Sequence, residues 1–159
     1  MLGVLFRALT YASVFVAVVL VYLPARTLAW AGVATPAHFG LAQGVGSVVV
    51  LAGASLALWS VGAFVALGRG TPAPFDPPRR LVVGGPYRYV RNPMYVGATL
   101  ALTGASLVYQ AWALAAYALG FALLAHLFVV LHEERALAAA FGHEYERYRQ
   151  HVGRWWPRA

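Results

Sequence analysis

The sequence predicts an all-α, polytopic membrane protein with about four transmembrane helices, a C-terminal helical hairpin and an interfacial amphipathic tail. Hydrophobic residues make up 61% of the chain and charged residues only 11%, whereas a typical soluble domain is about half apolar. The apolar residues form long runs, and a bilayer core about 30 Å thick needs about 20 residues of helix. Proline-rich or charged stretches separate these runs. We therefore expect one membrane domain over residues 1–159.

The net charge of +7 comes from arginine, because the chain contains no lysine. A basic soluble protein would suggest nucleic acid, but these arginines flank apolar runs, as membrane anchors do. We expect the membrane as a partner and no nucleic acid. Cysteine is absent, which excludes disulfides, thiolate metal sites and a cysteine nucleophile.

Residues 1–68 are predicted to form two N-terminal transmembrane helices. The first runs from about Leu2 to Leu23 and stops at Pro24, because proline interrupts a regular helix. The alternative is a cleaved signal peptide, with Arg7 before the apolar run and an Ala29-Trp30-Ala31 cleavage pattern after it. The apolar run is long for a signal peptide, which favours a span.

The second span runs from about Phe39 to Leu67 and exceeds the length of one crossing, so it should tilt, bend or extend beyond the bilayer. It carries small residues at helical spacing, which let a neighbouring helix approach closely. These are Gly40, Gly44, Gly46, Gly53 and Gly62. We interpret them as one side of a closely packed helix pair.

A proline-rich segment over residues 69–91 follows as a predicted cytoplasmic loop. Its prolines exclude a regular helix and favour an irregular path over the membrane surface. They are Pro72, Pro74, Pro77, Pro78 and Pro86.

Residues 92–142 are predicted to form a helical hairpin that extends into the cytoplasm. Its first helix should begin at Asn92-Pro93, since asparagine is a good N-cap and proline is favoured at the first helical position. This helix should end near Tyr109. The turn Gln110-Ala111 is very short, so the next helix should run antiparallel to the first.

The second helix of the hairpin starts near Trp112 and stays apolar to Leu131 except at His126. An ionisable group at membrane depth is rare, and for His126 we weigh a packed, hydrogen-bonded histidine against a role in a substrate channel. No helix breaker follows Leu131. The helix should therefore continue to Phe141, with Gly142 as its C-cap.

The tail, residues 143–159, mixes aromatic residues with arginines. Tyr145, Tyr148 and Val152 fall at positions i, i+3 and i+7, which predicts a short amphipathic helix in the membrane interface that seals the site from the aqueous side. A basic anchor with an aromatic belt is the alternative, and the two are compatible.

The arginines predict the orientation, because loops rich in basic residues face the cytoplasm. With four spans, Arg26 alone lies on the side opposite the termini. The side of the termini holds Arg7, Arg69, Arg79, Arg80, Arg88, Arg91, Arg135, Arg147, Arg149, Arg154 and Arg158. We expect a bacterial-type inner-membrane protein with both termini and the active site in the cytoplasm.

Two polar clusters flank the hairpin, one around Arg91 to Tyr95 and one at His132 to Arg135. In an antiparallel hairpin they lie side by side. The helix N-terminus and Arg91 suit an anionic group, whereas Glu133 and Glu134 suit a cationic or hydroxyl-rich group. The clusters predict a site for a zwitterion that carries a polyol. The alternative is that Arg88, Arg91 and Arg135 pair with the glutamates at the membrane surface.

The chain resembles the integral-membrane methyltransferases in a combination of two patterns that covers about Arg79 to Pro157. The superfamily includes the isoprenylcysteine carboxyl methyltransferases and the phospholipid N-methyltransferases. The patterns are Gly85-x-Tyr87-x-x-x-Arg91-Asn92-Pro93-x-Tyr95 and, after the apolar hairpin, Glu133-Glu134-x-x-Leu137-x-x-x-Phe141-Gly142-x-x-Tyr145-x-x-Tyr148.

The resemblance implies an S-adenosylmethionine-dependent enzyme that methylates a lipid or another membrane-partitioned small molecule. The pocket would be built by the last two membrane helices, the loop before them and the tail. The residues that would bind the cofactor are Leu81, Val82, Tyr87, Asn92, Pro93, Met94, Tyr95, Glu133 and Glu134. The methionine end of this cofactor is a zwitterion and its ribose supplies hydroxyls, which agrees with the charge pattern of the clusters.

Two departures concern the prenylcysteine substrate. Those enzymes usually carry histidine where this chain has Asn92, and an arginine about one turn before the acidic pair, where this chain reads Phe128-Val129-Val130-Leu131. That arginine is a proposed contact of the substrate carboxylate. Its absence argues against methylation of a prenylated cysteine carboxyl.

Methyl transfer from a sulfonium is an in-line displacement that depends on positioning and on a water-poor pocket. It requires no metal. We expect Arg91, Glu133 and His132 to act in catalysis, with His132 or a glutamate taking the proton of an amine or thiol acceptor.

The alternative function is a non-catalytic membrane subunit or a haem- or quinone-associated protein that uses His126, His132 or His143. Axial ligation of haem needs histidines aimed at one iron. His126 and His132 are six residues apart, about 240° around a helix, so they would not ligate one iron together.

Overall fold

The computed structural model describes residues 6, 10–11, 13–36, 38–68 and 79–158. In these residues all regular elements are helical, which confirms the predicted all-α class. Two elements, η1 and η3, are π-helical turns and η2 is a 3₁₀ turn. The elements are η1 (Val16–Tyr22), α2 (Leu23–Trp30), α3 (Leu41–Gly68), η2 (Gly85–Arg88), α4 (Pro93–Tyr109), α5 (Trp112–Phe128), η3 (Val129–Glu133), α6 (Glu134–Phe141) and α7 (His143–His151).

Three helices of the described residues are long and apolar enough to cross a membrane: Ser13–Trp30, Leu41–Gly68 and Trp112–Phe141. Many of their large apolar side chains, such as Leu58 and Leu119, are exposed on the protein surface. Because a lipid environment solvates such side chains, these surfaces fit an integral membrane protein. α4 has 17 residues and is shorter than the other three, so the predicted count of four crossings stays a prediction.

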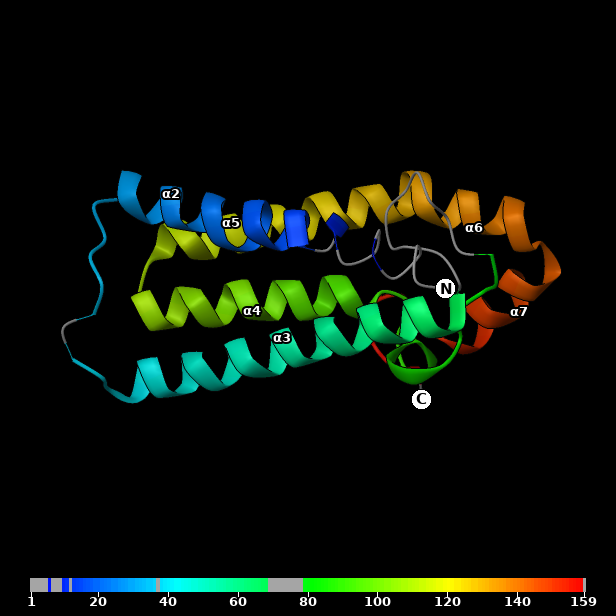
Figure 1. The fold of residues 1–159 in the computed structure, drawn as a ribbon, viewed down its shortest axis with the longest axis horizontal. Coiled ribbons are helices and arrows are strands. Elements are labelled where there is room, and N and C mark those ends of the chain that lie inside the picture. The colour runs from blue at the N-terminus through cyan, green and yellow to red at the C-terminus, as the bar shows by residue number, and fades with distance from the viewer. Residues whose placement is uncertain (1–5, 7–9, 12, 37, 69–78, 159) are drawn as a thin grey trace.

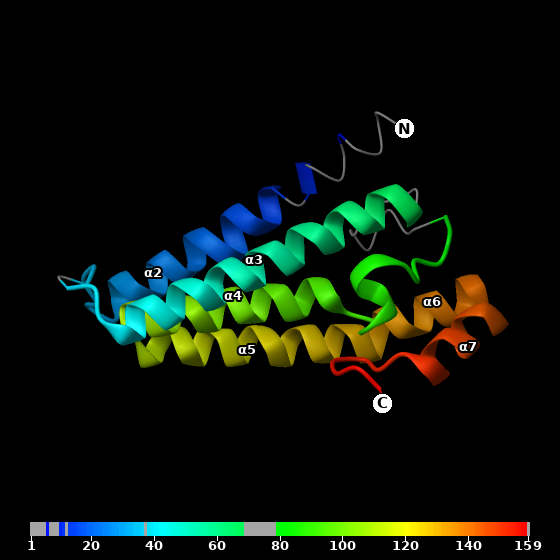
Figure 2. The same cartoon turned by 90° about the horizontal axis from the view of Figure 1, so that it is seen from below.

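The helix pair predicted from the glycines is α3 with α4, which lie side by side in both views of the fold (Figures 1 and 2). A Cβ atom at Gly53 would lie only 2.5 Å from the carbonyl oxygen of Gly97, and one at Gly46 only 2.7 Å from that of Gly104. The two glycines of each helix are seven residues apart and share one face. Backbone therefore packs against backbone, which confirms the predicted close approach at Gly46 and Gly53. The prediction is wrong for Gly40, Gly44 and Gly62, because no atom of α4 lies among the near neighbours of their Cβ positions.

The predicted end of the first span at Pro24 is wrong, because the helix continues to Trp30. The segment before the proline is the π-helical turn η1, in which an N–H bonds to the carbonyl five residues earlier, as Leu23 does to Val18. In that pattern the residue at position 24 would donate its N–H to the Val19 carbonyl, but proline has no N–H. The Tyr117 hydroxyl of α5 donates to that carbonyl at 2.8 Å instead, so a neighbouring helix compensates for the proline. The predicted start at Leu2 lies outside the described residues.

α4 begins at Pro93 and ends at Tyr109, as predicted. Gln110 adopts a left-handed conformation with φ of 49°, and after Ala111 the chain returns as α5 beside α4 (Figure 2). That both of these helices cross a membrane remains a prediction.

The helix that starts at Trp112 continues to Phe141, as predicted, and Gly142 ends it with φ of 48°. η3 inserts a wider turn at Val129–Glu133. Such turns are rare and occur frequently at functional sites. Here the turn contains His132 and Glu133, the first two residues of the second polar cluster.

α6 and α7 extend beyond the end of α4 that begins at Pro93 (Figures 1 and 2). α7 confirms the helix predicted in the tail, but it ends at His151, and Val152 is extended rather than helical. Of the predicted loop 69–91, residues 69–78 lie outside the described residues. The remainder is irregular apart from η2. The division into a membrane domain with a loop and a tail stays a prediction.

Candidate active site

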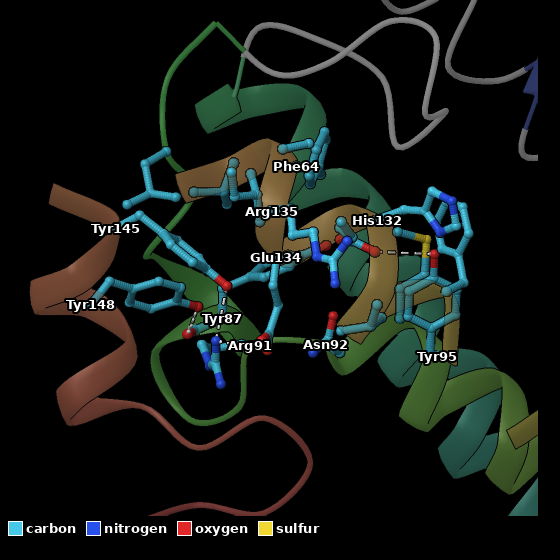
Figure 3. A pocket seen from close by; sticks show the side chains of 18 of the residues that line it. Phe64, Tyr87, Arg91, Asn92, Tyr95, His132, Glu134, Arg135, Tyr145 and Tyr148 are labelled. Atoms are coloured by element: carbon cyan, nitrogen blue, oxygen red, sulfur yellow. Dashed lines mark hydrogen bonds and ion pairs between the residues drawn. The ribbon is translucent and has the colours of Figure 1, made fainter. Parts of the chain in front are cut away.

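A cavity of about 500 Å³ lies where the start of α4 meets η3, α6 and α7 (Figure 3). All but one of the predicted site residues line it. They are Leu81, Val82, Tyr87, Arg91, Asn92, Met94, Tyr95, His132, Glu133 and Glu134. The exception is Pro93, which is fully buried at the first turn of α4 and does not reach the cavity.

The 3₁₀ turn η2 holds Tyr87 in the cavity wall. Gly85 begins this turn with φ of 60°, a conformation that favours glycine. Pro86 and Tyr87 follow and are buried. The Tyr87 ring contacts the ring of Phe64 from α3, with centroids 6.0 Å apart. The segment before α4 is therefore anchored on α3.

Tyr95 and Glu133 join the two predicted clusters. The Tyr95 hydroxyl of α4 donates a hydrogen bond to Oε2 of Glu133 at 3.3 Å. Glu133 is only partly exposed and forms no ion pair with any described residue. It therefore presents a carboxylate to the cavity with a neutral partner only.

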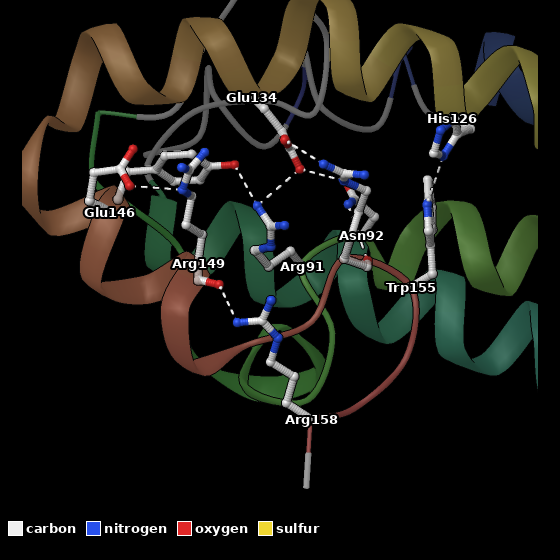
Figure 4. Close-up of polar contacts among 10 residues, drawn as sticks. Arg91, Asn92, His126, Glu134, Glu146, Arg149, Trp155 and Arg158 are labelled. Atoms are coloured by element: carbon white, nitrogen blue, oxygen red, sulfur yellow. Dashed lines mark hydrogen bonds and ion pairs between the residues drawn. The ribbon is translucent and has the colours of Figure 1, made fainter.

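Glu134 differs from its neighbour, because two arginines neutralise it (Figure 4). Arg91 Nη1 lies 3.0 Å from Glu134 Oε1. Arg154 binds both oxygens of the same carboxylate, with Nε donating to Oε1 at 2.6 Å and Nη2 donating to Oε2 at 2.9 Å. This bidentate geometry gives the strongest type of charged hydrogen bond, and the bond with Glu134 raises the pKa of Arg154. The predicted surface pairing of Arg91 with a glutamate is thus present, but the pair is largely buried.

The tail closes one side of the cavity through two tyrosines. Arg91 Nη1 donates to the Tyr145 hydroxyl at 2.9 Å, and the Tyr148 hydroxyl donates to the Tyr87 carbonyl at 2.6 Å. The chain after α7 then pairs with the segment before α4, since the Arg91 amide donates to the Gly153 carbonyl at 2.8 Å. The tail is therefore bonded to the cavity wall at several points.

Burial keeps the phenols of this wall neutral. It raises the pKa of Tyr87, and the negative charge of Glu133 adds to the shift. Burial also raises the pKa of Tyr148 and of Tyr145, although the nearby Arg91 guanidinium acts in the opposite direction on both. These hydroxyls therefore remain hydrogen-bond donors at neutral pH.

Asn92 is the N-cap residue of α4, as predicted, and its carbonyl accepts a hydrogen bond from the Val96 amide at 3.2 Å, but its side chain makes no capping bond. Its amide Nδ2 donates instead to the Arg154 carbonyl at 3.2 Å. The side chain is turned toward the tail, which it helps to fix, rather than toward the first turn of α4.

The histidines do not converge on one point. His132 is exposed, lines the cavity and stacks on Phe128 with centroids 5.7 Å apart. His126 lies on α5, where its Nδ1 accepts a hydrogen bond from the Trp155 indole at 3.0 Å. The packed, hydrogen-bonded interpretation of His126 is therefore confirmed. Within the described part of the chain, no three His, Cys, Asp or Glu side chains group to hold a metal ion.

Two charged residues of the site were not among the predicted site residues. Arg154, which anchors Glu134, carries no signal in the sequence that separates it from the other tail arginines. Arg135 lines the cavity and has no hydrogen bond or ion pair with any described residue. Its position directly after Glu133 and Glu134 was a usable signal, because consecutive residues of a helix lie at nearly the same depth.

A comparison with protein families supports the resemblance. The model of the phospholipid methyltransferase family matches residues 41–144, which is more than half of the chain. The match includes α3 and all predicted cofactor-binding residues, and ends before Tyr145 and Arg154. No curated protein and no solved structure matches the chain.

Proposed function

This chain belongs to the phospholipid methyltransferase family, and we propose that it is an S-adenosylmethionine-dependent methyltransferase that uses the cavity at the start of α4 as its active site. We propose as its substrate a lipid or another small molecule that partitions into the membrane. Family membership supports a membrane methyltransferase. The cofactor, the substrate and the residue roles are proposals.

The observation that carries the proposal is Glu133, a cavity carboxylate that has a neutral partner, Tyr95, and no ion pair with any described residue. Apolar side chains such as Val82, Met94 and Phe128 supply most of the lining around it. An unpaired carboxylate in such surroundings is costly unless a cation compensates it. The ammonium and sulfonium groups of S-adenosylmethionine are cations that the Glu133 carboxylate could compensate. The residues of the cavity therefore fit this cofactor.

Arg135 supplies the opposite charge in the same cavity. Because Arg91 is engaged by Glu134 and Tyr145, we propose that Arg91 positions the wall and that Arg135 is the cation available to an anionic group. That group is the carboxylate of the cofactor or an acidic part of the substrate. Glu133 and Arg135 together match the zwitterion predicted from the sequence.

The remaining cavity residues provide a dry, ordered surface for the transfer. When bound, S-adenosylmethionine supplies a methyl group that a nucleophile displaces in line from the sulfonium. The buried Tyr87 hydroxyl stays neutral, the Tyr95 hydroxyl donates to Glu133, and the tail excludes water. This favours a reaction in which a positive charge is lost from the donor. His132 is exposed and close enough to the cavity to accept the proton of an amine or thiol acceptor.

We propose that this site faces the cytoplasm, as the arginine distribution predicts. The chain has no native cysteine, so single cysteines are clean reporters of orientation. Arg147→Cys on α7 and Ala34→Cys between α2 and α3 are both exposed. In intact cells, a membrane-impermeant maleimide should label the residue at position 34 and not the one at 147. The reverse pattern overturns the orientation.

The function is tested by methyl transfer itself. Membranes that contain the protein are incubated with S-adenosylmethionine labelled in its methyl group, and extracted lipids are searched for label. Glu133→Gln should abolish incorporation, whereas the matched variant Glu146→Gln, on the exposed part of α7, should retain it. Incorporation that is equal in Glu133→Gln and in wild type would refute the proposed site, and no incorporation into any extract would refute the substrate class.

A further inference from the structure

A second cavity of about 310 Å³ shares Arg91 and Glu134 with the first. Figure 4 shows the polar contacts of these two residues, of Arg149 and of Arg158. Four of the six residues that line the second cavity are arginines: Arg91, Arg149, Arg154 and Arg158. The other two are Glu134 and Gln150. The lining therefore carries four positive charges and one negative charge, and nothing in the proposed methyl transfer uses this excess.

The ion pairs and hydrogen bonds among the lining residues do not neutralise all of the positive charge in this cavity. Glu134 is shared by Arg91 and Arg154, so one carboxylate serves two guanidinium groups. Arg158 donates from Nη1 to the backbone carbonyls of Arg149 and Gln150, at 3.1 and 2.6 Å. Carbonyl groups do not neutralise a guanidinium.

Arg149 supplies open donor positions, and Arg91 adds charge. Arg149 forms an ion pair through Nε with Glu146 at 2.8 Å, and both side chains are exposed. Such a pair contributes little to stability. The Arg91 side chain is only 9% exposed, yet its Nε is buried without a hydrogen-bond partner in the described residues. Arg91 therefore contributes positive charge to the cavity rather than an accessible Nε donor.

We infer that this arginine-lined cavity binds a phosphate group. Phosphate offers several acceptor oxygens and at least one negative charge, and guanidinium forks recognise it with two hydrogen bonds each. A cavity of about 310 Å³ has room for this group. Two sources carry this chemistry, a free phosphate and the headgroup of an acidic phospholipid.

Binding is measured by calorimetry on the purified full-length protein in detergent, with inorganic phosphate in one arm and short-chain phosphatidic acid in the other. We expect saturable binding in at least one arm, and the arm that binds identifies the source. Arg149→Gln and Arg158→Gln should each weaken binding roughly tenfold, the equivalent of one lost charged hydrogen bond. The control is Arg147→Gln, which removes an exposed arginine from the same helix outside the cavity and should leave the affinity unchanged.

Two outcomes overturn the inference: saturable binding in neither arm, or equal weakening by Arg147→Gln and Arg149→Gln. Thermal unfolding of each variant identifies loss of fold. If Arg149→Gln unfolds, Gln150→Glu provides the second variant, because a carboxylate in the cavity should repel phosphate and abolish binding. Binding of S-adenosylhomocysteine should persist in Arg149→Gln, which separates this site from the proposed methyl-transfer site.

Discussion

Arg91 and Glu134 form an ion pair at 3.0 Å with side chains only 9% and 13% exposed, and both residues line both of the cavities described above. The pair joins the segment before α4 to the start of α6. Arg154 binds the same carboxylate from the tail. One glutamate therefore connects the three parts of the chain that surround the proposed active site.

Glu134→Gln should destabilise the protein by about 3 kcal/mol, because removal of one partner leaves a buried guanidinium uncompensated. Thermal unfolding in detergent measures the effect. The control Glu146→Gln breaks the exposed pair with Arg149 and should change the free energy of unfolding by no more than about 0.5 kcal/mol. Equal effects of the two variants would show that Glu134 is not an anchor.

Tyr95→Phe should weaken S-adenosylmethionine binding about fivefold, because Glu133 loses its neutral donor and its orientation. A typical hydrogen bond contributes about 1 kcal/mol, and the loss of the hydroxyl leaves the ring packing in place. The matched control is Tyr89→Phe, which removes an exposed hydroxyl that lies outside the cavity lining. Unaltered affinity in Tyr95→Phe would argue against a role for the Tyr95–Glu133 bond.

Gly53→Ala should destabilise the contact between α3 and α4 by about 1–3 kcal/mol, the usual cost of overpacking. The new methyl group would lie 2.5 Å from the Gly97 carbonyl oxygen, where only backbone movement relieves the clash. Gly62→Ala is the control on the same helix. Nothing lies within 4 Å of its Cβ position, so it should be neutral or stabilising. A stable Gly53→Ala protein would contradict the backbone packing described for this pair.

Tyr117→Phe should cost about 1 kcal/mol, because the Val19 carbonyl loses the hydrogen bond from the Tyr117 hydroxyl. The cost should shrink in a Pro24→Ala background, since alanine restores the missing backbone N–H. A double-mutant cycle on thermal unfolding measures this coupling. Additive effects of the two substitutions would mean that Tyr117 does not compensate for Pro24.

The fold was largely predictable because helices in this chain follow local rules. The start of α4 follows from proline at a first helical position, and the end of α6 follows from glycine at a helix end. The error at Pro24 came from the same rules. The compensating hydroxyl belongs to Tyr117, 93 positions along the chain from Pro24, and a contact between distant segments leaves no local pattern.

The sequence was enough to predict which residues line the candidate site, but not which hydrogen bonds and ion pairs they form. The antiparallel arrangement of α4 and α5 was enough to place Tyr95 beside Glu133. It did not distinguish Glu133 from Glu134, because neighbouring carboxylates differ only in what the tail brings to them. Arg154 neutralises one and not the other, and that choice depends on the path of the chain after α7.

The central claim is that the cavity around Glu133 holds S-adenosylmethionine, and calorimetric titration of the purified protein with S-adenosylmethionine and S-adenosylhomocysteine tests it most directly. We predict saturable binding of both at one site per chain. Glu133→Gln should weaken binding of S-adenosylmethionine more than that of S-adenosylhomocysteine, which lacks the sulfonium charge, and Glu146→Gln should bind as wild type does. Absence of binding, or equal affinities in Glu133→Gln and wild type, would contradict the claim.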